Sequence, residues 1–271
     1  MRTFVIGDVH GMLDELRSLV DKLSPESGDR FMFLGDLVDK GPDSLGVVSF
    51  VRDLVGRFPG SEVVCGNHEE SVMRLWERST KSGTWDGLRK VEREPWIKLL
   101  PSEDLEWLRS LPLVVRPLPG VLLVHGGLFP SFFDKHGEIG EVSPTWHRGG
   151  GKRMDRMRRF LRIRQIYKPG SLSPKGKDVS GQMVSLGDEG DNTERWGESY
   201  DGREGFVFYG HDPSRDGIRR QPHSMGIDTG CVFGGELTSV VLREGQDPRD
   251  GEVISVPGRC FAPWLEAFEA D

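Results

Sequence analysis

Six short motifs bring acidic, amide and imidazole side chains next to glycine, in a fixed order along the chain. They are Gly7–Gly11 (GDVHG), Gly35–Gly41 (GDLVDKG), Gly66–Glu69 (GNHE), His125–Gly127 (HGG), Gly210–Asp212 (GHD) and Gly226–Gly230 (GIDTG). The packing of a hydrophobic core does not require these residue types. Asp, Asn and His supply oxygen and nitrogen ligands that suit Mn²⁺, Fe²⁺ or Zn²⁺. The motifs therefore indicate a hydrolytic site built on two metal ions.

The candidate metal ligands indicate a metal site only as a set, because a lone Asp-x-His pair is more often an ordinary turn. Asp8 and His10 can face the same side only if the strand before them has ended, and the glycines on either side permit that break. The predicted ligands are Asp8, His10, Asp36, Asn67, His125 and His211. This set is enough for two cations, with Asp36 as the natural bridge. Two cations about 3.5–4 Å apart can share a hydroxide and hold the attacking and leaving oxygens of a phosphoryl displacement.

His68 and Asp39 are the candidates for proton transfer. His68 directly follows Asn67, and adjacent residues point to different sides, so we expect His68 to face substrate and not to bind the same metal. There it would act as a general acid for the leaving oxygen. Asp39 could orient and charge it, as a carboxylate does for a catalytic imidazole. The alternative is a surface histidine and a helix-capping aspartate.

Basic side chains near the motifs are candidates for binding phosphate. Lys40 could meet a phosphate oxygen as a point charge, and a solvated lysine in a turn is the alternative. Arg162 and Arg164 alternate within Phe160–Ile166, so an extended segment would place both on one face, where they could clamp a phosphoryl group. A solvated basic face is the alternative for these two, and Arg148 is a weaker candidate for their role.

Other residues near the site are expected to support it. We expect Asp228 to support a nearby ligand histidine without binding the metal. Tyr167, Trp196 and Tyr200 could stack on a base, although packing is the simpler expectation for each.

The elements that position these motifs follow from hydrophobic periodicity. Thr3–Ile6, Phe31–Leu34 and Glu62–Cys65 are short apolar runs typical of buried strands. Apolar residues at helical spacing over 13–23 and 45–55 predict helices between them. This β-α-β-α-β order predicts parallel strands with helical crossovers. Ligands bind at the carboxyl ends of strands in such sheets, so the first three motifs should meet at one edge.

Later segments continue the mixed pattern. Helices are expected over Glu69–Arg78 and Ser102–Ser110, and strands over Leu113–Val115, Val121–Val124, Phe206–Tyr209 and Thr238–Arg243. The stretch 148–168 holds nine Lys or Arg and one Asp, and 171–202 is rich in Gly, Ser, Asp and Glu. Long polar segments inside a compact domain often form lids or binding loops. We expect one catalytic domain over residues 1–271, with an insertion over about 148–204 as a lid or substrate-binding segment.

Composition narrows the class of protein. Hydrophobic residues make up 36% and charged residues 29%, as in soluble globular enzymes, and the net charge of −7 argues against a stable nucleic-acid partner. No apolar run is long enough to span a membrane. Cleavage of a signal peptide would remove motif residues, so a cytoplasmic location is expected. Three cysteines without a Cys-x-x-Cys pair predict neither a disulfide framework nor a structural zinc site.

Together the motifs resemble those of the calcineurin-like metallophosphoesterases, in the phosphoprotein-phosphatase superfamily, over most of the chain. The resemblance implies a mixed α/β (α+β) fold, with a central β-sandwich flanked by helices and a di-metal centre. By this similarity one metal would be bound by Asp8, His10 and Asp36, and the other by Asp36, Asn67, His125 and His211. His68 with Asp39 would be the proton-donating pair.

Finer motifs resemble a subgroup, the ApaH-like phosphatases and symmetrical diadenosine tetraphosphatases. These motifs are Gly35–Ser44, Leu105–Pro112, Phe160–Arg164, Tyr209–Asp212 and Gly226–Thr238. The tetraphosphatases cut dinucleoside polyphosphates into two nucleoside diphosphates. Two positions depart from them: Lys40 stands where they and the protein phosphatases carry Arg, and Glu69 stands where they usually carry Asp.

We therefore expect a di-metal hydrolase of phosphoesters and phosphoanhydrides. It would act on diadenosine tetraphosphate and related nucleoside polyphosphates through a metal-bridged hydroxide, with Mn²⁺ as the expected metal and Fe, Zn or Co as alternatives. The basic segment on an acidic protein suits such a polyanionic substrate. A phosphoprotein (Ser/Thr/Tyr) phosphatase, a polyphosphatase and an RNA-cap trimming enzyme are alternatives with the same chemistry. A non-catalytic, metal-dependent binding module is a further alternative, against which the complete ligand set with His68 argues.

Overall fold

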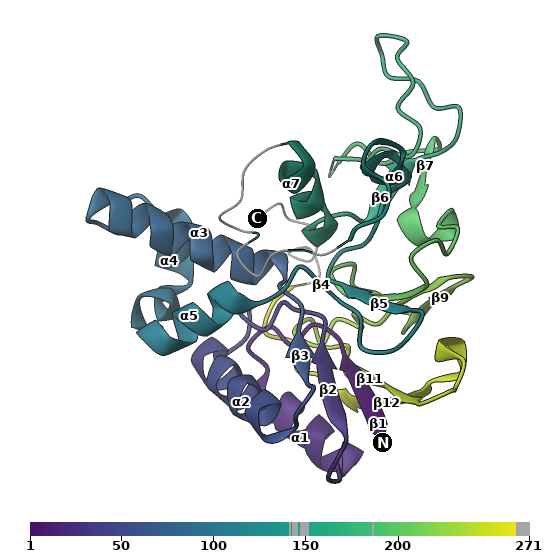
Figure 1. Ribbon diagram of the computed structural model, residues 1–271. Helices are drawn as coiled ribbons and strands as arrows, with labels where there is room; N and C mark the ends of the chain where they lie inside the picture. Colours follow the sequence, from purple (N-terminus) through teal and green to yellow (C-terminus); the bar gives the residue numbers. More distant parts are fainter. Residues whose placement is uncertain (141, 143–145, 147–151, 186, 264–271) are drawn as a thin grey trace.

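Two five-stranded sheets form the centre of the molecule, and helices flank them (Figure 1). The computed structural model describes residues 1–271 except 141, 143–145, 147–151, 186 and 264–271. The first sheet has the order β12 (Glu252–Pro257), β11 (Glu236–Arg243), β1 (Arg2–Ile6), β2 (Arg30–Phe33), β3 (Glu62–Val63). The second has the order β4 (Val114–Val115), β5 (Val121–Val124), β8 (Phe206–Tyr209), β10 (Ser224–Gly226), β9 (Arg219–Gln221). A small third sheet pairs β6 (Gln165–Tyr167) with β7 (Thr193–Arg195).

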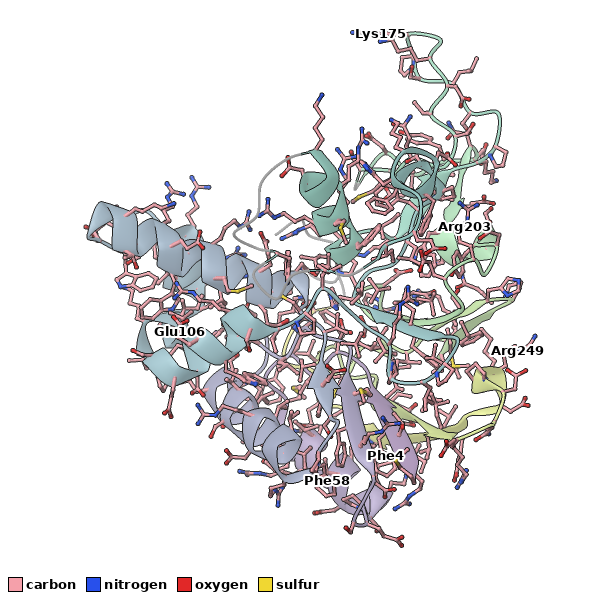
Figure 2. All side chains as sticks on the ribbon, viewed as in Figure 1. Phe4, Phe58, Glu106, Lys175, Arg203 and Arg249 are labelled. Atoms are coloured by element: carbon pink, nitrogen blue, oxygen red, sulfur yellow. The ribbon has the colours of Figure 1, made fainter. Side chains whose placement is uncertain are left out.

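The two large sheets share an apolar layer, which makes them a sandwich. Val5 and Met32 from the first sheet lie in one buried cluster with Phe208 from the second. The alternate residues of the first sheet face the other way, toward the helices: the ring centroid of Phe31 lies 5.1 Å from that of Phe4 and 5.0 Å from that of Phe58. Phe4 and Phe58 are labelled in Figure 2. Burial on both faces explains why these strands are continuous apolar runs.

The expected β-α-β-α-β unit is confirmed. Strand β1 pairs in parallel with β2, and β2 with β3. The crossovers are α1 (Leu13–Leu23) and α2 (Ser44–Arg57). In the second sheet β5, β8 and β10 are also parallel. Motifs therefore follow the carboxyl ends of parallel strands in both sheets, whereas the sequence predicted this meeting only for the first three.

Several helices of the described residues were not indicated by the sequence, and one stretch among them contacts the candidate site. It consists of α4 (Arg89–Arg93), the linking residue Glu94 and the 3₁₀ helix η1 (Pro95–Leu99), which together we call the α4–η1 arm. The other helices in the part of the chain that the structure describes include α3 (Asn67–Ser82), α5 (Ser102–Ser110), α6 (Pro130–His136), α7 (Lys152–Met157), η3 (Arg158–Leu161), η4 (Trp196–Glu198) and η5 (Pro248–Asp250). Within the described ranges, no helix has the length and apolar character needed to cross a membrane.

The segment over about 148–204 is anchored on the core and extends outward as a hairpin. The backbone nitrogens of Gly126 and Gly127 donate to the Phe160 carbonyl, and Trp196 Nε1 donates to the Gly126 carbonyl. Trp196 is buried and therefore packs, as expected, and does not offer a stacking surface. Lys175 lies at the far tip of the outward loop (Figure 2). The extended segment predicted over Phe160–Ile166 is wrong at its start, because 3₁₀ helix η3 extends to Leu161. Strand β6 begins only at Gln165.

Candidate active site

Left-handed backbone turns follow the strands that carry the motifs. Six non-glycine residues among those described have positive φ, and five of them lie in the motifs: His10, Asp36, Asp39, Lys40 and His211. This conformation costs a residue with a Cβ about 1–2 kcal/mol, and such strain gathers at functional sites. The strands have ended before these residues, which satisfies the condition set by the Asp8-x-His10 spacing.

Backbone hydrogen bonds between motifs hold the turns in place. The nitrogens of Val9 and His10 both donate to the Asp36 carbonyl, over 3.1 and 2.8 Å. The nitrogen of Gly11 donates to the Leu37 carbonyl over 2.8 Å. The first two motifs are thus one hydrogen-bonded unit, although a helix separates them in sequence.

The glycines beside the ligands allow carboxylates from other motifs to approach the backbone. A Cβ at Gly66 would lie 2.2 Å from Asp36 Oδ1, and one at Gly210 would lie 2.0 Å from Asp8 Oδ1. Both distances are far below van der Waals contact, so these positions exclude every side chain. The repeated Gly-Asp, Gly-Asn and Gly-His pairs are therefore requirements of close packing around the site.

Glu69 fastens the second motif to the third. Its side chain is fully buried. Oε1 accepts a hydrogen bond from Leu37 N (2.8 Å), and Oε2 accepts from Asp36 N (2.9 Å) and Gly66 N (2.8 Å). The sequence marked Glu69 only as a departure from one subgroup, whereas its contacts give it the task of positioning Asp36.

Asp36 lies at the centre of two groups of possible metal ligands. Its Oδ2 lies 3.6 Å from His10 Nε2 and 3.2 Å from His125 Nε2. One group that could hold an ion is His10, Asp36 and His68, and the other is Asp36, His125 and His211, with the ligand atoms of each group within 4.8 Å of one another. The carboxylate common to both groups is the one that the sequence named as the bridge.

Two of the imidazoles are oriented by backbone carbonyls. His10 Nδ1 lies 2.9 Å from the Val38 carbonyl, and His125 Nδ1 lies 2.7 Å from the Leu34 carbonyl. A proton on Nδ1 in each ring leaves the Nε2 lone pair facing Asp36, as metal-binding histidines require. Burial and the charge of Lys40 lower the pKa of His10 well below its usual value. The neutral imidazole is the form that binds metal.

Asp8 and His211 supply a direct sign that cations fit this site. Asp8 Oδ1 and His211 Nε2 are buried and have no hydrogen-bond partner in the described part of the chain. A buried polar atom without a partner costs about 1–3 kcal/mol, and a bound cation would pair both. Asp8 Oδ2 accepts a hydrogen bond from His211 N over 3.0 Å, which joins the first and fifth motifs. The residues present therefore fit divalent metal ions.

The last predicted ligand, Asn67, lies in the same cluster. Its Oδ1 is 3.0 Å from His125 Nε2, and it occupies the first turn of α3. The helix begins two residues earlier than the predicted Glu69, so Asn67 and His68 are held by helical backbone. All six predicted ligands are brought together in one place.

The buried carboxylates differ in their proton affinity. Burial, together with the charges of Asp228 and Asp36, raises the pKa of Asp8 well above its usual value. Burial alone would raise the pKa of Asp36, but the imidazoles of His125 and His68 hold it well below its usual range. Asp36 therefore stays charged, as a bridging ligand must.

Asp228 lines the cavity but has a different partner from the expected one. Burial raises its pKa to about 6. Its Oδ1 accepts a hydrogen bond from the backbone nitrogen of Gly230 over 3.0 Å. This contact does not provide the expected support of a ligand histidine.

His68 and Asp39 form a buried pair. His68 Nδ1 lies 2.7 Å from Asp39 Oδ2, and its backbone nitrogen donates to Asp36 Oδ1 over 3.0 Å. The His68 ring lies against the ring of His10, with centroids 4.8 Å apart, and its Nε2 is 3.9 Å from Asp36 Oδ2. His68 is thus nearer to the ligands than the sequence indicated, while its Nδ1 is engaged by Asp39.

Three residues of the α4–η1 arm contact the second motif, and the sequence gave no sign of them. Lys90 Nζ lies 2.8 Å from Asp39 Oδ2. Trp96 Nε1 donates to Asp39 Oδ1 (3.2 Å) and to Glu94 Oε2 (3.0 Å). Glu94 Oε1 accepts from the backbone nitrogen of Lys40 over 3.0 Å. No motif surrounds these residues, and their spacing is that of an ordinary helical surface.

A cavity of about 270 Å³ opens over the cluster. Its wall includes the three candidate phosphate-binding residues Lys40, Arg162 and Arg164, together with Met183, Val184, Ser185 and Glu189 of the 148–204 segment. Lys40 Nζ lies 3.5 Å from His10 Nε2 and 3.3 Å from His68 Nε2. Arg162 pairs with Glu70 over 2.9 Å, and Arg164 donates to the His211 carbonyl over 3.3 Å. Arg148 lies outside the described residues.

Comparison with known proteins agrees with this geometry. Residues 1–236 match the family model described as calcineurin-like phosphoesterase. A symmetrical bis(5'-nucleosyl)-tetraphosphatase of Pseudomonas putida (strain W619) is 27% identical over 276 residues, covering 91% of each chain. The protein of the same name from Pectobacterium atrosepticum is 29% identical over 272 residues, covering 88% of this chain and 90% of the relative.

Solved structures show the same arrangement of elements. A crystal structure of a protein proposed to be a diadenosine tetraphosphatase superposes with a TM-score of 0.65 at 27% identity, covering 95% of this chain and 94% of the other. A cold-active protein-tyrosine phosphatase of a Shewanella species gives a TM-score of 0.58 at 15% identity, covering 93% and 80%. The second likeness concerns the fold alone.

Proposed function

This chain belongs to the calcineurin-like phosphoesterase family, and from that premise we propose that it hydrolyses diadenosine tetraphosphate and related nucleoside polyphosphates at a centre of two divalent cations. One observation carries the proposal above the others. A single cavity is lined by members of the ligand cluster, by three basic side chains and by the polar 148–204 segment. A chain of several phosphates needs more positive charge than a single phosphate does, and this cavity offers it.

The division of labour among the residues follows from their contacts. Asp8, His10 and Asp36 would hold one cation, and Asp36, Asn67, His125 and His211 the other. Such cations polarise a phosphoryl oxygen and lower the pKa of a water molecule. His68 holds a proton at Nε2 for the leaving oxygen, while Asp39 fixes Nδ1. Lys40, Arg162 and Arg164 neutralise the phosphate oxygens.

The metal, the role of the 148–204 segment and the cellular location are part of the same proposal. Mn²⁺ is the proposed metal, because the carboxylate oxygens of Asp8 and Asp36 and the amide oxygen of Asn67 suit it. The 148–204 segment serves as a substrate-binding lid, since Met183 and Val184 of this segment lie in the wall of the cavity that the candidate ligands also line. The names of the relatives cited above support the dinucleotide substrate, and a nucleotide substrate suits a cytoplasmic location.

A substrate panel tests the proposal. The protein is stripped of metal, reloaded with Mn²⁺, and given diadenosine tetraphosphate, a phosphopeptide and inorganic polyphosphate in parallel. The expected product from the dinucleotide is ADP alone, because symmetrical cleavage yields two identical halves. Turnover of the phosphopeptide with no ADP from the dinucleotide would replace this proposal with a phosphoprotein phosphatase. Turnover of nothing by a protein that holds two ions would indicate a binding module.

A further inference from the structure

We propose that Lys90 and Trp96 are positioning residues that hold the Asp39 carboxylate in the orientation needed to fix His68 for proton transfer. This inference rests on the proposed function, because the pair that it concerns belongs to the same site. It assigns a role to the α4–η1 arm, which carries none of the six motifs.

Both oxygens of Asp39 are held from the arm. Oδ2 lies 2.7 Å from His68 Nδ1 and 2.8 Å from Lys90 Nζ, and Oδ1 accepts a hydrogen bond from Trp96 Nε1 over 3.2 Å. The torsion that turns a carboxylate about its Cβ–Cγ bond is broad, so one partner alone leaves the plane poorly defined. Partners on both oxygens define the plane, and the plane sets the direction in which the His68 ring points.

Lys90 also supplies the charge that the buried pair needs. Asp39 is 1% exposed and His68 is 3% exposed. A buried carboxylate without a nearby cation is strongly unfavourable, and the Lys90 side chain, itself 15% exposed, lies against it. Burial alone would raise the pKa of Asp39, but the hydrogen bond from His68 and the charge of Lys90 hold it below its usual range.

The same arm holds the backbone beneath these side chains. Asp39 and Lys40 are consecutive left-handed residues, with φ of 70° and 67°. The Lys40 nitrogen donates to Glu94 Oε1, while the Asp39 nitrogen donates to Ser44 Oγ over 2.9 Å. Trp96 is linked to Glu94 as well, so the arm contacts main chain and side chain of the second motif as one unit.

A double-mutant cycle separates positioning from general support of the fold. Lys90→Met, Asp39→Asn and the double variant are prepared as full chains loaded with Mn²⁺, with diadenosine tetraphosphate as substrate. Lys90→Met should lower kcat by about 10- to 100-fold with KM unchanged, as loss of an outer partner of a site histidine does. In the Asp39→Asn background it should cost nothing further, because the residue through which it acts is already altered.

Two further variants and one control complete the test. Lys90→Arg keeps the charge and should restore most of kcat. Trp96→Phe keeps the aromatic ring but removes the hydrogen bonds from Nε1 to Asp39 Oδ1 and to Glu94 Oε2. It leaves Lys90 in place and should lower kcat by a smaller factor, which keeps the test available if Lys90→Met does not fold. Lys98→Met, an exposed lysine on the same arm, should leave kcat unchanged.

A readout without turnover distinguishes this inference from the proposed function. In ¹⁵N NMR spectra the Nδ1–H signal of His68 should be present in the wild type and lost or shifted in Lys90→Met and in Trp96→Phe. If the wild type does not turn over diadenosine tetraphosphate but the His68 signal still differs between the wild type and these variants, the proposed substrate is refuted and the positioning role is kept. Equal losses from Lys90→Met in both backgrounds, or an unchanged His68 signal, would overturn the positioning role whatever the substrate.

Discussion

Oε2 of Glu69 lies 2.9 Å from the backbone nitrogen of Asp36, so a fully buried carboxylate positions the residue that both candidate metal groups share. Glu69→Gln would keep the shape of the side chain but turn an amino group toward backbone donors. Hydrogen bonds to a charged group contribute about 1.5–3 kcal/mol each. We expect a loss of about 3 kcal/mol in the free energy of unfolding, measured by urea denaturation. Glu106→Gln, on the exposed face of α5, is the control, and equal midpoints for the two variants would contradict this role.

Asp36 should control the occupancy of both metal positions. Its Oδ2 lies within 3.6 Å of His10 Nε2 and 3.2 Å of His125 Nε2. Asp36→Asn is therefore expected to lose both ions after dialysis, whereas His10→Ala should lose one. Metal analysis by mass spectrometry gives the number of ions per chain. One ion retained by Asp36→Asn would show that the two positions do not share this carboxylate.

His68 should matter for rate and not for metal content. General acid catalysis contributes about 10²–10⁴-fold, so His68→Asn is expected to lower kcat on diadenosine tetraphosphate by a factor in this range. The metal content of the variant, measured on the same sample, should equal that of the wild type. His68 Nε2 lies only 3.9 Å from Asp36 Oδ2, so the position of His68 fits a metal ligand as well as a proton donor. The metal content of the variant distinguishes these two roles. A variant that lost one ion would make His68 a ligand, and full turnover would remove it from the chemistry.

Asp29 lies far from the candidate site, and its ionisation should make the free energy of unfolding depend on pH. It accepts hydrogen bonds from Arg2 N (2.7 Å), Arg2 Nη2 (2.6 Å) and Glu26 N (2.9 Å). Burial alone would raise its pKa, but these partners hold it below the usual 3.8. A lowered carboxylate pKa stabilises the fold above the unfolded value, and the contribution disappears as the pH falls through the folded value.

The measurement for Asp29 compares Asp29→Asn with the wild type in urea at pH 7 and at pH 3. The variant should be less stable by about 1–2 kcal/mol at pH 7. The difference should shrink at the lower pH, because the unfolded chain then takes up a proton on this carboxylate and the stabilisation from its lowered pKa begins to be lost. A difference that stayed constant with pH would mean that the charge of Asp29 contributes nothing.

The sequence was informative wherever a pattern repeats locally. The apolar runs at β1, β2 and β5 and the glycines beside the ligands were visible because strand burial and close backbone approach each leave a residue signature. Lys90 and Trp96 left none, since they lie 51 and 57 residues from Asp39 and nothing in their own neighbourhood depends on that contact. Glu69 could be read in the sequence as part of the third motif. Its contacts with three backbone nitrogens could not, because they form only when the second and third motifs come together in the folded chain.

The 148–204 segment was predicted only in outline for a similar reason. Its polar composition indicated an excursion from the core, and Arg162 and Arg164 do line the cavity. The buried attachment through Phe160 and Trp196 depends on single aromatic residues with no periodic neighbours. Periodicity cannot detect an anchor of that kind.

Five of the left-handed residues are candidates for the chemistry of the site and also carry backbone strain, so the proposed activity and the stability of the fold favour different residues at these positions. Glycine at Lys40 would adopt the same turn without a Cβ penalty of about 1–2 kcal/mol, yet it would remove the cation that faces His10 and His68. Selection for stability alone would therefore favour the replacement of these residues by glycine. The proposed function therefore accounts for side chains at these five positions that stability alone would not favour.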